Sequence, residues 1–374
     1  MPSWLKEGRG SLCGANVSLL LRERGITKPL LVAGERTKNV FFARTGMRLP
    51  VFDAFHPNPD LQDCVAGAAL YQEKGCDGLI SIGGGSAMDT AKGIKALLMT
   101  DIAHVRANQL PPEGKVPHLA IPGTAGTGAE TTAVAVLYED GQKLSVDHPA
   151  LLPDGVLLDG SLLDTLPEYH RKSCAMDALA QGIESWWAKK ATPGSRIHAE
   201  RAIRGVLDNL TAYLQGDRKA QDEMLHAAYE SGVAILTTRT TAAHAMSYQI
   251  TKKLGAAHGH ACMLTLPHLW AHLAAQAEYQ PMLTELAHIL GGEKSMDGAV
   301  LLRGLLAVLE LDKIPMPDDA TLDMLAASVN PERLGNHPEA LTTAQLRAIY
   351  VQAFTPMTDT ERAEAIAAWE QYGK

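Results

Sequence analysis

The stretch Ser81-Ile82-Gly83-Gly84-Gly85-Ser86-Ala87-Met88-Asp89-Thr90-Ala91-Lys92 decides the fold of the N-terminal half. A short apolar run leads into three glycines, and a helical pattern follows with Ser86 near its start. Glycine lets the backbone approach a ligand closely, and the free N–H groups at a helix N-terminus attract an anion. The stretch therefore predicts a strand–loop–helix unit that binds a pyrophosphate. Because it departs from the common G-x-G-x-x-G pattern, a plain strand-to-helix turn is the alternative reading of the loop alone.

Strand-like runs recur on both sides of this loop. Buried strands are expected at residues 29–33, 78–82, 118–122 and 155–159. An alanine-rich helical segment lies between the first two, at residues 61–74, and ends at Gly75. Strands that alternate with helices of this length indicate a parallel, doubly wound sheet. We predict a Rossmann-like dinucleotide-binding α/β domain over residues 1–160.

After about residue 160 the strand pattern stops. Long segments rich in alanine and leucine follow, and helices are expected at residues 175–189, 195–215, 219–236 and 261–275. A chain of 374 residues is long enough for two domains. We therefore predict an all-helical metal- and substrate-binding domain over residues 161–374.

A second loop follows the predicted strand at residues 118–122. It reads Pro122-Gly123-Thr124-Ala125-Gly126-Thr127-Gly128. Threonine hydroxyls and glycine backbone offer hydrogen bonds to phosphate, ribose or amide groups. Two such loops after parallel strands fit a ligand at the carboxyl edge of the sheet. Lys143 could contribute a positive charge or a hydrogen bond to the binding of this ligand. The alternative is that Lys143 is a solvated surface residue.

A sparse polar set follows in the helical half. Asp177 and Gln181 are four residues apart, so in a helix they present two oxygens on one face. His244 and His258 arrive from later segments and could complete a divalent-metal site of mixed oxygen and nitrogen ligands. Glu184 lies on the same predicted helix face and is expected to support a ligand from outside, as carboxylates do at metal sites.

Composition excludes several classes of protein. The net charge of −8 gives no sign of the basic surface that nucleic-acid binding requires. No run approaches the roughly 18 apolar residues of a membrane span. The N-terminus lacks the apolar core of a signal peptide. The five cysteines are scattered without paired spacing, which fits reduced thiols. We expect a cytoplasmic protein that binds neither nucleic acid nor membrane.

Together these motifs resemble the iron-containing (group III) alcohol dehydrogenases. The matching motifs, in chain order, are Gly83-Gly84-Gly85-Ser86-x-x-Asp89-x-Ala91-Lys92, Pro122-x-Thr124-Ala125-Gly126-Thr127-Gly128, Met176-Asp177-Ala178-Leu179 and His258-Gly259. The resemblance implies a dehydroquinate synthase-like architecture, an active site in the cleft between two domains, and a homodimer. It implies cofactor contacts at Gly84, Gly85, Ser86, Asp89, Thr124, Thr127 and Lys143. It implies metal ligands at Asp177, Gln181, His244 and His258, with Fe²⁺ as the expected ion and Zn²⁺ as the alternative.

Two positions depart from the family pattern. Gln181 stands where the family carries a histidine ligand, and an amide oxygen binds iron or zinc less well than imidazole does. Tyr248 stands where members commonly carry another histidine near the nicotinamide. Tyr248 could donate a proton or only fill space, and His260 could relay a proton, orient substrate or make a structural hydrogen bond.

One branch of the family, the phosphonoacetaldehyde reductases, resembles this chain most around Thr237-Thr238-Arg239-Thr240-Thr241. A guanidinium with neighbouring hydroxyls suits a tetrahedral oxyanion. We expect Arg239 with Thr237, Thr238 and Thr241 to bind the phosphonate, and Ser185 is a further candidate contact. The alternative is that Arg239 is an exposed helix residue and the threonines bond to local backbone.

The expected reaction is hydride transfer from NADPH or NADH to a short aldehyde with an anionic tail. Phosphonoacetaldehyde would give 2-hydroxyethylphosphonate, while the metal ion polarises the carbonyl oxygen. Gly34 ends the first predicted strand where the family often has an acidic residue, so Arg36 or Lys38 could meet the 2′-phosphate of NADPH.

The sequence is also compatible with other functions. Sulfoacetaldehyde or succinic semialdehyde would use the same anion contacts, and a general alcohol dehydrogenase would need none of them. A dehydroquinate-synthase-type lyase would need a larger cationic set than Arg239. A nucleotide-binding module without catalysis would leave the set from Asp177 to His258 without a role.

Overall fold

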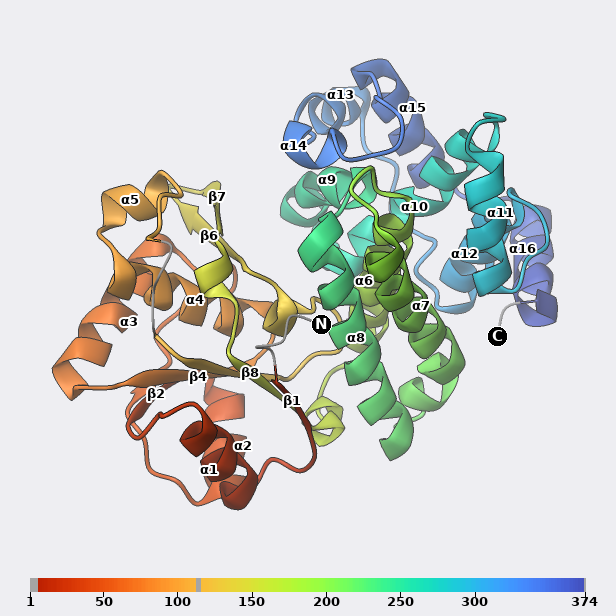
Figure 1. The fold of residues 1–374 in the computed structure, drawn as a ribbon. Coiled ribbons are helices and arrows are strands. Elements are labelled where there is room, and N and C mark those ends of the chain that lie inside the picture. Colours follow the sequence, from red (N-terminus) through yellow and green to blue (C-terminus); the bar gives the residue numbers. More distant parts are fainter. Residues whose placement is uncertain (1–5, 112–115, 373–374) are drawn as a thin grey trace. The chain divides into compact units, whose positions relative to one another are not determined.

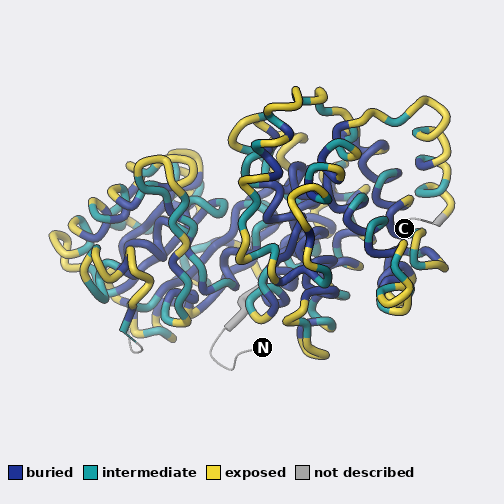
Figure 2. Tube along the Cα trace, turned by 90° about the horizontal axis from the view of Figure 1, so that it is seen from above, coloured by how far each residue is buried: buried dark blue, intermediate teal, exposed yellow. Residues whose placement is uncertain are grey.

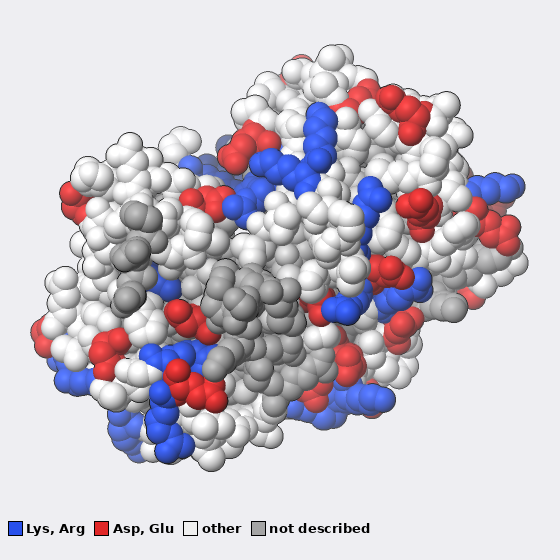
Figure 3. Space-filling model, viewed as in Figure 1, with Lys and Arg blue, Asp and Glu red and all other residues white. Residues whose placement is uncertain are grey.

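The structure, a computed structural model, describes residues 6–111 and 116–372. It separates into two compact units, Met1–Thr165 and Leu166–Lys374 (Figure 1). No helix in these described ranges is both long and apolar enough to cross a membrane. On the face seen in Figure 3, basic and acidic side chains are interspersed.

The first unit is built on a parallel sheet whose described strands lie in the order β1-β8-β5-β4-β2-β3. The strands of this sheet are β1 (Lys6–Arg9), β2 (Pro29–Ala33), β3 (Val51–Phe52), β4 (Gly78–Gly83), β5 (His118–Pro122) and β8 (Gly155–Leu158). The helices are α1 (Gly14–Glu23), α2 (Glu35–Thr45), α3 (Leu61–Lys74), α4 (Gly85–Met99) and α5 (Ile102–Arg106), with short turns η1 (Ala129–Thr131), η2 (Pro149–Leu151) and η3 (Gly160–Leu163). The four predicted strands are confirmed as β2, β4, β5 and β8, and the predicted helix is confirmed as α3.

Helices cover both faces of this sheet, with α1 and α2 on one side and α3 and α4 on the other (Figure 1). Successive residues of β2 point to opposite faces. Leu30 and Val32 pack in the cluster with α3 and α4, while Leu31 and Ala33 pack in the cluster with α1 and α2. A strand buried on both faces must be apolar at every position, which explains its unbroken apolar run.

The hairpin β6 (Val134–Glu139) and β7 (Gln142–Asp147) was not predicted. These two strands pair antiparallel as a separate two-stranded sheet. Its turn is Asp140-Gly141, and both residues have positive φ, at 50° and 72°. Asp-Gly is a strong hairpin signal because this turn requires left-handed conformations, so the sequence did contain the information. The hairpin places Lys143 on β7.

The second unit contains helices and no strand among its described residues. Its elements are α6 (Glu168–Trp187), α7 (Pro193–Leu214), α8 (Arg218–Thr238), α9 (Ala242–Gln249), the π-helical turn η4 (Ile250–Leu254), α10 (His258–Ala274), α11 (Gln280–Leu290), α12 (Asp297–Val308), α13 (Asp319–Ala327), α14 (Pro331–Leu334), α15 (Thr343–Phe354) and α16 (Asp359–Tyr372). The helices predicted at 175–189, 195–215, 219–236 and 261–275 correspond to α6, α7, α8 and α10. The expected fold class, an α/β domain followed by an all-helical domain, is confirmed.

Helix α6 forms the centre of the second unit and packs against α7, α8 and α10. Its residues from Ala175 to Trp187 are all buried. Figure 2 shows buried residues running through the interior of each unit. The polar side chains of α6, including Asp177 and Glu184, therefore lie in the interior, where they need bonding partners.

Candidate active site

The two glycine-containing loops of the first unit lie side by side at the carboxyl edge of the sheet. They follow β4 and β5, which are adjacent strands with Gly83 opposite Pro122. A Cβ atom built on Gly84 would lie 3.3 Å from Cγ2 of Thr124, and one on Gly85 would lie 3.4 Å from Cγ2 of Thr127. The structure thus brings these four predicted cofactor residues together at the start of α4.

The charged cofactor candidates lie around the next turn of α4. Nζ of Lys92 is 4.0 Å from Oδ1 of Asp89. Burial raises the pKa of Asp89 to about 6, against the opposing effects of the Lys92 charge, the Val136 N–H and the Lys143 charge. Lys143 is therefore in electrostatic contact with Asp89. Ser86 accepts a hydrogen bond from the backbone N–H of Asn58 at 3.3 Å.

A methyl group on Gly85 tests the predicted cofactor loop. The new Cβ of Gly85→Ala would make ordinary contact with Thr127 at 3.4 Å, and alanine suits a helix better than glycine. We expect an unchanged fold but NADH or NADPH binding weaker by about 10-fold, equal to about 1.4 kcal/mol, because the methyl narrows the space between the two loops. Fluorescence titration of the cofactor measures the affinity, and thermal unfolding checks the fold. Unchanged affinity would contradict a cofactor site here.

Three helices of the second unit bring the metal-ligand candidates together. Asp177 comes from α6, His244 from α9 and His258 from the first turn of α10. Nε2 of His244 lies 3.3 Å from Oδ1 of Asp177, and Nε2 of His258 lies 3.9 Å from the same oxygen. Ligands of a tetrahedral transition metal, bound at roughly 2.0–2.3 Å, lie about 3.3–3.8 Å apart. The donor set therefore fits a divalent metal ion.

Cys262 also belongs to this set, although it was not predicted as a ligand. Its Sγ lies 3.9 Å from Nε2 of His258. One donor atom from each of Asp177, His244, His258 and Cys262 can be chosen so that all lie within 4.8 Å of one another. The available signal was the i,i+4 spacing from His258 to Cys262, which puts both side chains on one face of α10.

Outer hydrogen bonds orient both imidazoles toward Asp177. Nδ1 of His244 bonds to Oε2 of Glu184, a carboxylate with no exposed surface. Nδ1 of His258 lies 3.3 Å from the hydroxyl of Ser247. A proton on each Nδ1 leaves each Nε2 lone pair facing Asp177, as in histidines that bind metal. Glu184 thus takes the supporting position that its place on α6 suggested.

Electrostatics in this cluster favour a cation. Burial opposes the charged form of His258, but Cys262 and Asp177 outweigh it and raise the pKa of the ring to about 9. Burial likewise opposes the Cys262 thiolate, but His244 and His258 lower its pKa to about 7. Burial also opposes the Asp177 carboxylate, yet the two histidines hold its pKa below the usual value. Positive charge stabilises both anionic donors, and a metal ion would supply it in place of protons.

Gln181 and Tyr248 lie beside the cluster. As oriented here, Nε2 of Gln181 faces Oδ1 of Asp177 at 3.3 Å, and its Oε1 accepts a hydrogen bond from Ser231 at 2.9 Å. The amide oxygen is thus turned away from Asp177. The ring of Tyr248 stacks on His258, with ring centres 6.1 Å apart and planes within 5°. Tyr248 is therefore next to a candidate ligand.

Most hydroxyls assigned to the anion site are bonded inside the protein. Thr238 donates to Ser185 at 3.0 Å, and both side chains are fully buried. The Thr241 hydroxyl donates to Oε1 of Glu184 at 2.6 Å. Ser185 and Thr238 are thus hydrogen-bonded to each other, and Thr241 is bonded to Glu184, which orients His244. The three hydroxyls are not gathered around one point.

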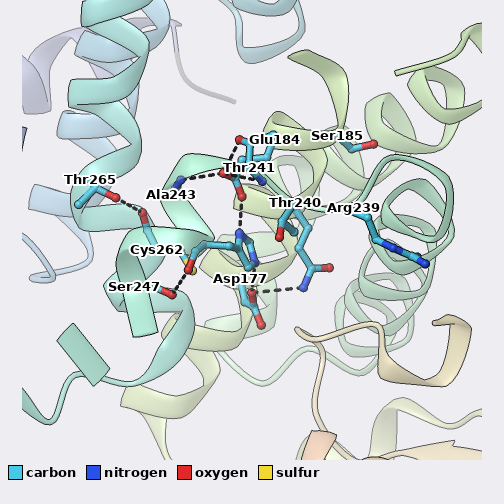
Figure 4. A network of polar contacts seen from close by, with 12 residues as sticks. Asp177, Glu184, Ser185, Arg239, Thr240, Thr241, Ala243, Ser247, Cys262 and Thr265 are labelled. Atoms are coloured by element: carbon cyan, nitrogen blue, oxygen red, sulfur yellow. Dashed lines mark hydrogen bonds and ion pairs between the residues drawn. The ribbon is translucent and has the colours of Figure 1, made fainter. Parts of the chain in front are cut away.

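Arg239 lies where α8 ends, with a left-handed φ of 62°. Its Nη1 donates to the carbonyl of Leu236 at 2.8 Å. Figure 4 shows its side chain extending away from Asp177 and Glu184. Thr237 is exposed on the last turn of α8. The binding of an anion by Arg239 and Thr237 remains a prediction.

His260 uses both ring nitrogens within the protein. Nε2 lies 2.8 Å from the carbonyl oxygen of Leu311, and Nδ1 lies 3.1 Å from the hydroxyl of Tyr169. The ring is buried, and burial lowers its pKa. These contacts are structural hydrogen bonds, the alternative to a proton relay that the sequence left open for His260.

The two basic residues considered for a 2′-phosphate have different surroundings. Lys38 forms ion pairs with Glu35 and Asp53, each at 2.6 Å. Arg36 donates to the hydroxyl of Thr165, a neutral partner that does not balance its charge. Arg36 is thus the better of the two for a phosphate.

Comparison with known proteins adds an independent finding. Residues 3–160 match the family model of iron-containing alcohol dehydrogenase, and residues 172–354 match the C-terminal model of the Fe-containing alcohol dehydrogenase family. The probable alcohol dehydrogenase EutG of Salmonella typhimurium is 32% identical over 260 residues, 67% of this chain and 63% of that protein. The phosphonoacetaldehyde reductase of Streptomyces viridochromogenes is 36% identical over 230 residues, 57% of this chain and 58% of that protein.

A solved structure shares the fold over nearly its full length. The sulfoacetaldehyde reductase of Bifidobacterium kashiwanohense, in complex with NAD⁺, superposes with a TM-score of 0.85 at 25% identity. The match covers 95% of this chain and 97% of that one.

Proposed function

Because the chain belongs to the iron-containing alcohol dehydrogenase family, we propose that it is a metal-assisted, nicotinamide-linked reductase of short aldehydes. The convergence of the Asp177 carboxylate with two imidazole Nε2 atoms carries this proposal, since a structural core has no need of three such donors around one point. The adjacent glycine and threonine loops at the start of α4 would bind the phosphates of the nicotinamide cofactor.

The residues divide the chemistry between them. When bound, the nicotinamide supplies a hydride and the metal ion polarises the aldehyde oxygen. Asp177, His244 and His258 would hold the ion, and Glu184 fixes the ring of His244. Tyr248, stacked on His258, is the candidate that donates a proton to the product oxygen.

We propose an anionic aldehyde as substrate, with phosphonoacetaldehyde reduced to 2-hydroxyethylphosphonate. The likeness to a phosphonoacetaldehyde reductase supports this choice, and Arg239 beside the segment that leads to His244 supplies a cation. Sulfoacetaldehyde is the second candidate, supported by the fold shared with a sulfoacetaldehyde reductase. NADH and NADPH are both compatible with the site, and Arg36 is the residue that would favour NADPH.

Cofactor oxidation with a panel of aldehydes tests the function. We expect phosphonoacetaldehyde to be reduced with a kcat/KM at least about 10-fold above that of propanal, a difference of about 1.4 kcal/mol in transition-state binding. Chelator should abolish turnover, and Fe²⁺ or Zn²⁺ should restore it. Full activity in a protein shown to be free of metal would refute the metal-assisted mechanism.

The substitution Arg239→Met provides the specificity control, because it keeps a long side chain and removes the charge. We expect a raised KM for phosphonoacetaldehyde and sulfoacetaldehyde with little change for propanal. Equal effects on all three aldehydes would instead assign Arg239 a structural role at the end of α8.

A further inference from the structure

Cys262 occupies the position of a ligand. It lies one turn after His258 on α10, and its side chain is fully buried. Buried cysteines usually lie among apolar side chains and behave as small hydrophobes. The surroundings of Cys262 are different, because its sulfur lies 3.9 Å from Nε2 of His258 and belongs to the donor cluster with His244 and Asp177.

Gln181, by contrast, does not present its oxygen to this cluster. The amide group lies between Asp177 and Ser231, with its nitrogen toward the carboxylate and its oxygen accepting from the serine hydroxyl. In this arrangement the amide nitrogen of Gln181 holds the carboxylate of Asp177 in place. The cluster then has three donors from Asp177, His244 and His258, so one more protein donor completes four. Ions at such sites can expand to five ligands, which leaves a place for a substrate.

We propose that Cys262 is a thiolate ligand of the metal ion, in place of the ligand expected at position 181. Binding breaks the S–H bond, forms a metal–sulfur bond and releases the proton to solvent. With Asp177, the thiolate brings two negative charges against a divalent ion, so the loaded site is neutral. Sulfur is a soft donor, and an Asp/His/His/Cys set suits Zn²⁺ well.

The inference rests on the proposed metal-assisted function, but its test needs no turnover. The full chain is stripped with chelator and reloaded with Co²⁺, whose absorption spectrum reports its ligands. We expect one cobalt ion per chain and an intense thiolate-to-cobalt charge-transfer band in the near ultraviolet. Cys262→Ser should lose this band, and Gln181→Ala should keep it.

Cys174→Ser is the matched control, since Cys174 belongs to the same unit but not to the donor cluster. This variant should keep the band. If Cys262→Ser does not fold, a variant with serine at positions 13, 64, 76 and 174 decides the question, because it leaves Cys262 as the only cysteine of the chain. A band that survives Cys262→Ser, or a cobalt-loaded protein without a band, would overturn the inference.

The two proposals can fail separately. Chelator-sensitive aldehyde reduction by a protein whose cobalt form lacks the band would refute the thiolate ligand and keep the reductase. A thiolate band that depends on Cys262, in a protein that reduces none of the aldehydes, would support the ligand and refute the reductase.

Discussion

The substitution Glu184→Gln is expected to weaken metal binding by about 10- to 100-fold, the usual effect of losing a group that orients a ligand. Glu184 accepts from Nδ1 of His244 through one oxygen. Its other oxygen accepts from the Thr241 hydroxyl at 2.6 Å and the Ala243 N–H at 2.8 Å. A carboxylate can only accept, whereas an amide has an NH₂ group that must face donors on one side. The glutamine would therefore misorient His244 or leave a buried donor unpaired.

An unpaired buried donor also lowers the free energy of unfolding by about 1–3 kcal/mol. Competition with a chromogenic chelator measures the metal affinity, and denaturant unfolding measures the stability. Glu168→Gln is the matched control, because Glu168 lies on the same helix and its carboxylate is exposed in an ion pair with Lys172. Wild-type metal affinity in Glu184→Gln would show that the carboxylate does not act through His244.

Gly259→Ala is expected to damage the fold and the metal site together. A Cβ atom at this position would lie 1.9 Å from the carbonyl oxygen of Ser173 and 2.6 Å from the backbone nitrogen of Asp177. Both are backbone atoms of α6, so no side chain can move aside. The helices α6 and α10 would have to separate, and this would pull His258 away from Asp177.

Overpacking of this kind costs about 1–3 kcal/mol and sometimes more. For a unit of this size we expect the midpoint of thermal unfolding to fall by about 2–4 °C for each kcal/mol. Metal content should fall in the same variant. Gly194→Ala is the control in α7, because its nearest neighbour is the Thr192 hydroxyl at 3.9 Å. A stable Gly259→Ala protein with full metal content would mean that the two helices are not in close contact.

The first unit was well predicted because its signals are local. The apolar run of β2 and the capped segment of α3 each determine an element within a few residues. The adjacency of the loops after β4 and β5 then follows from parallel topology. The hairpin at Asp140-Gly141 was not predicted, although the Asp-Gly pair is a local signal for its turn.

The donor cluster was only partly predictable, because its residues come from different helices. The spacing of Asp177 and Gln181 shows that they share a face of α6, but not which of them points into the cluster. The orientation of Gln181 depends on Ser231, a residue of α8 whose hydroxyl donates to the amide oxygen. Cys262 entered the cluster in the same way, through the packing of α10 against α6 and α9.

By itself, the sequence determined the two-part fold and the glycine loop after β4, because strand and helix periods and glycine loops are properties of neighbouring residues. It also singled out Asp177, His244 and His258 as candidate ligands, through their residue types and the family resemblance. Only the tertiary structure decided the bonding of each polar side chain. Thr241 forms a hydrogen bond with Glu184, Thr238 with Ser185, and His260 with the carbonyl of Leu311. A buried polar group must bond with whatever packing places beside it, and those partners lie far away in the chain.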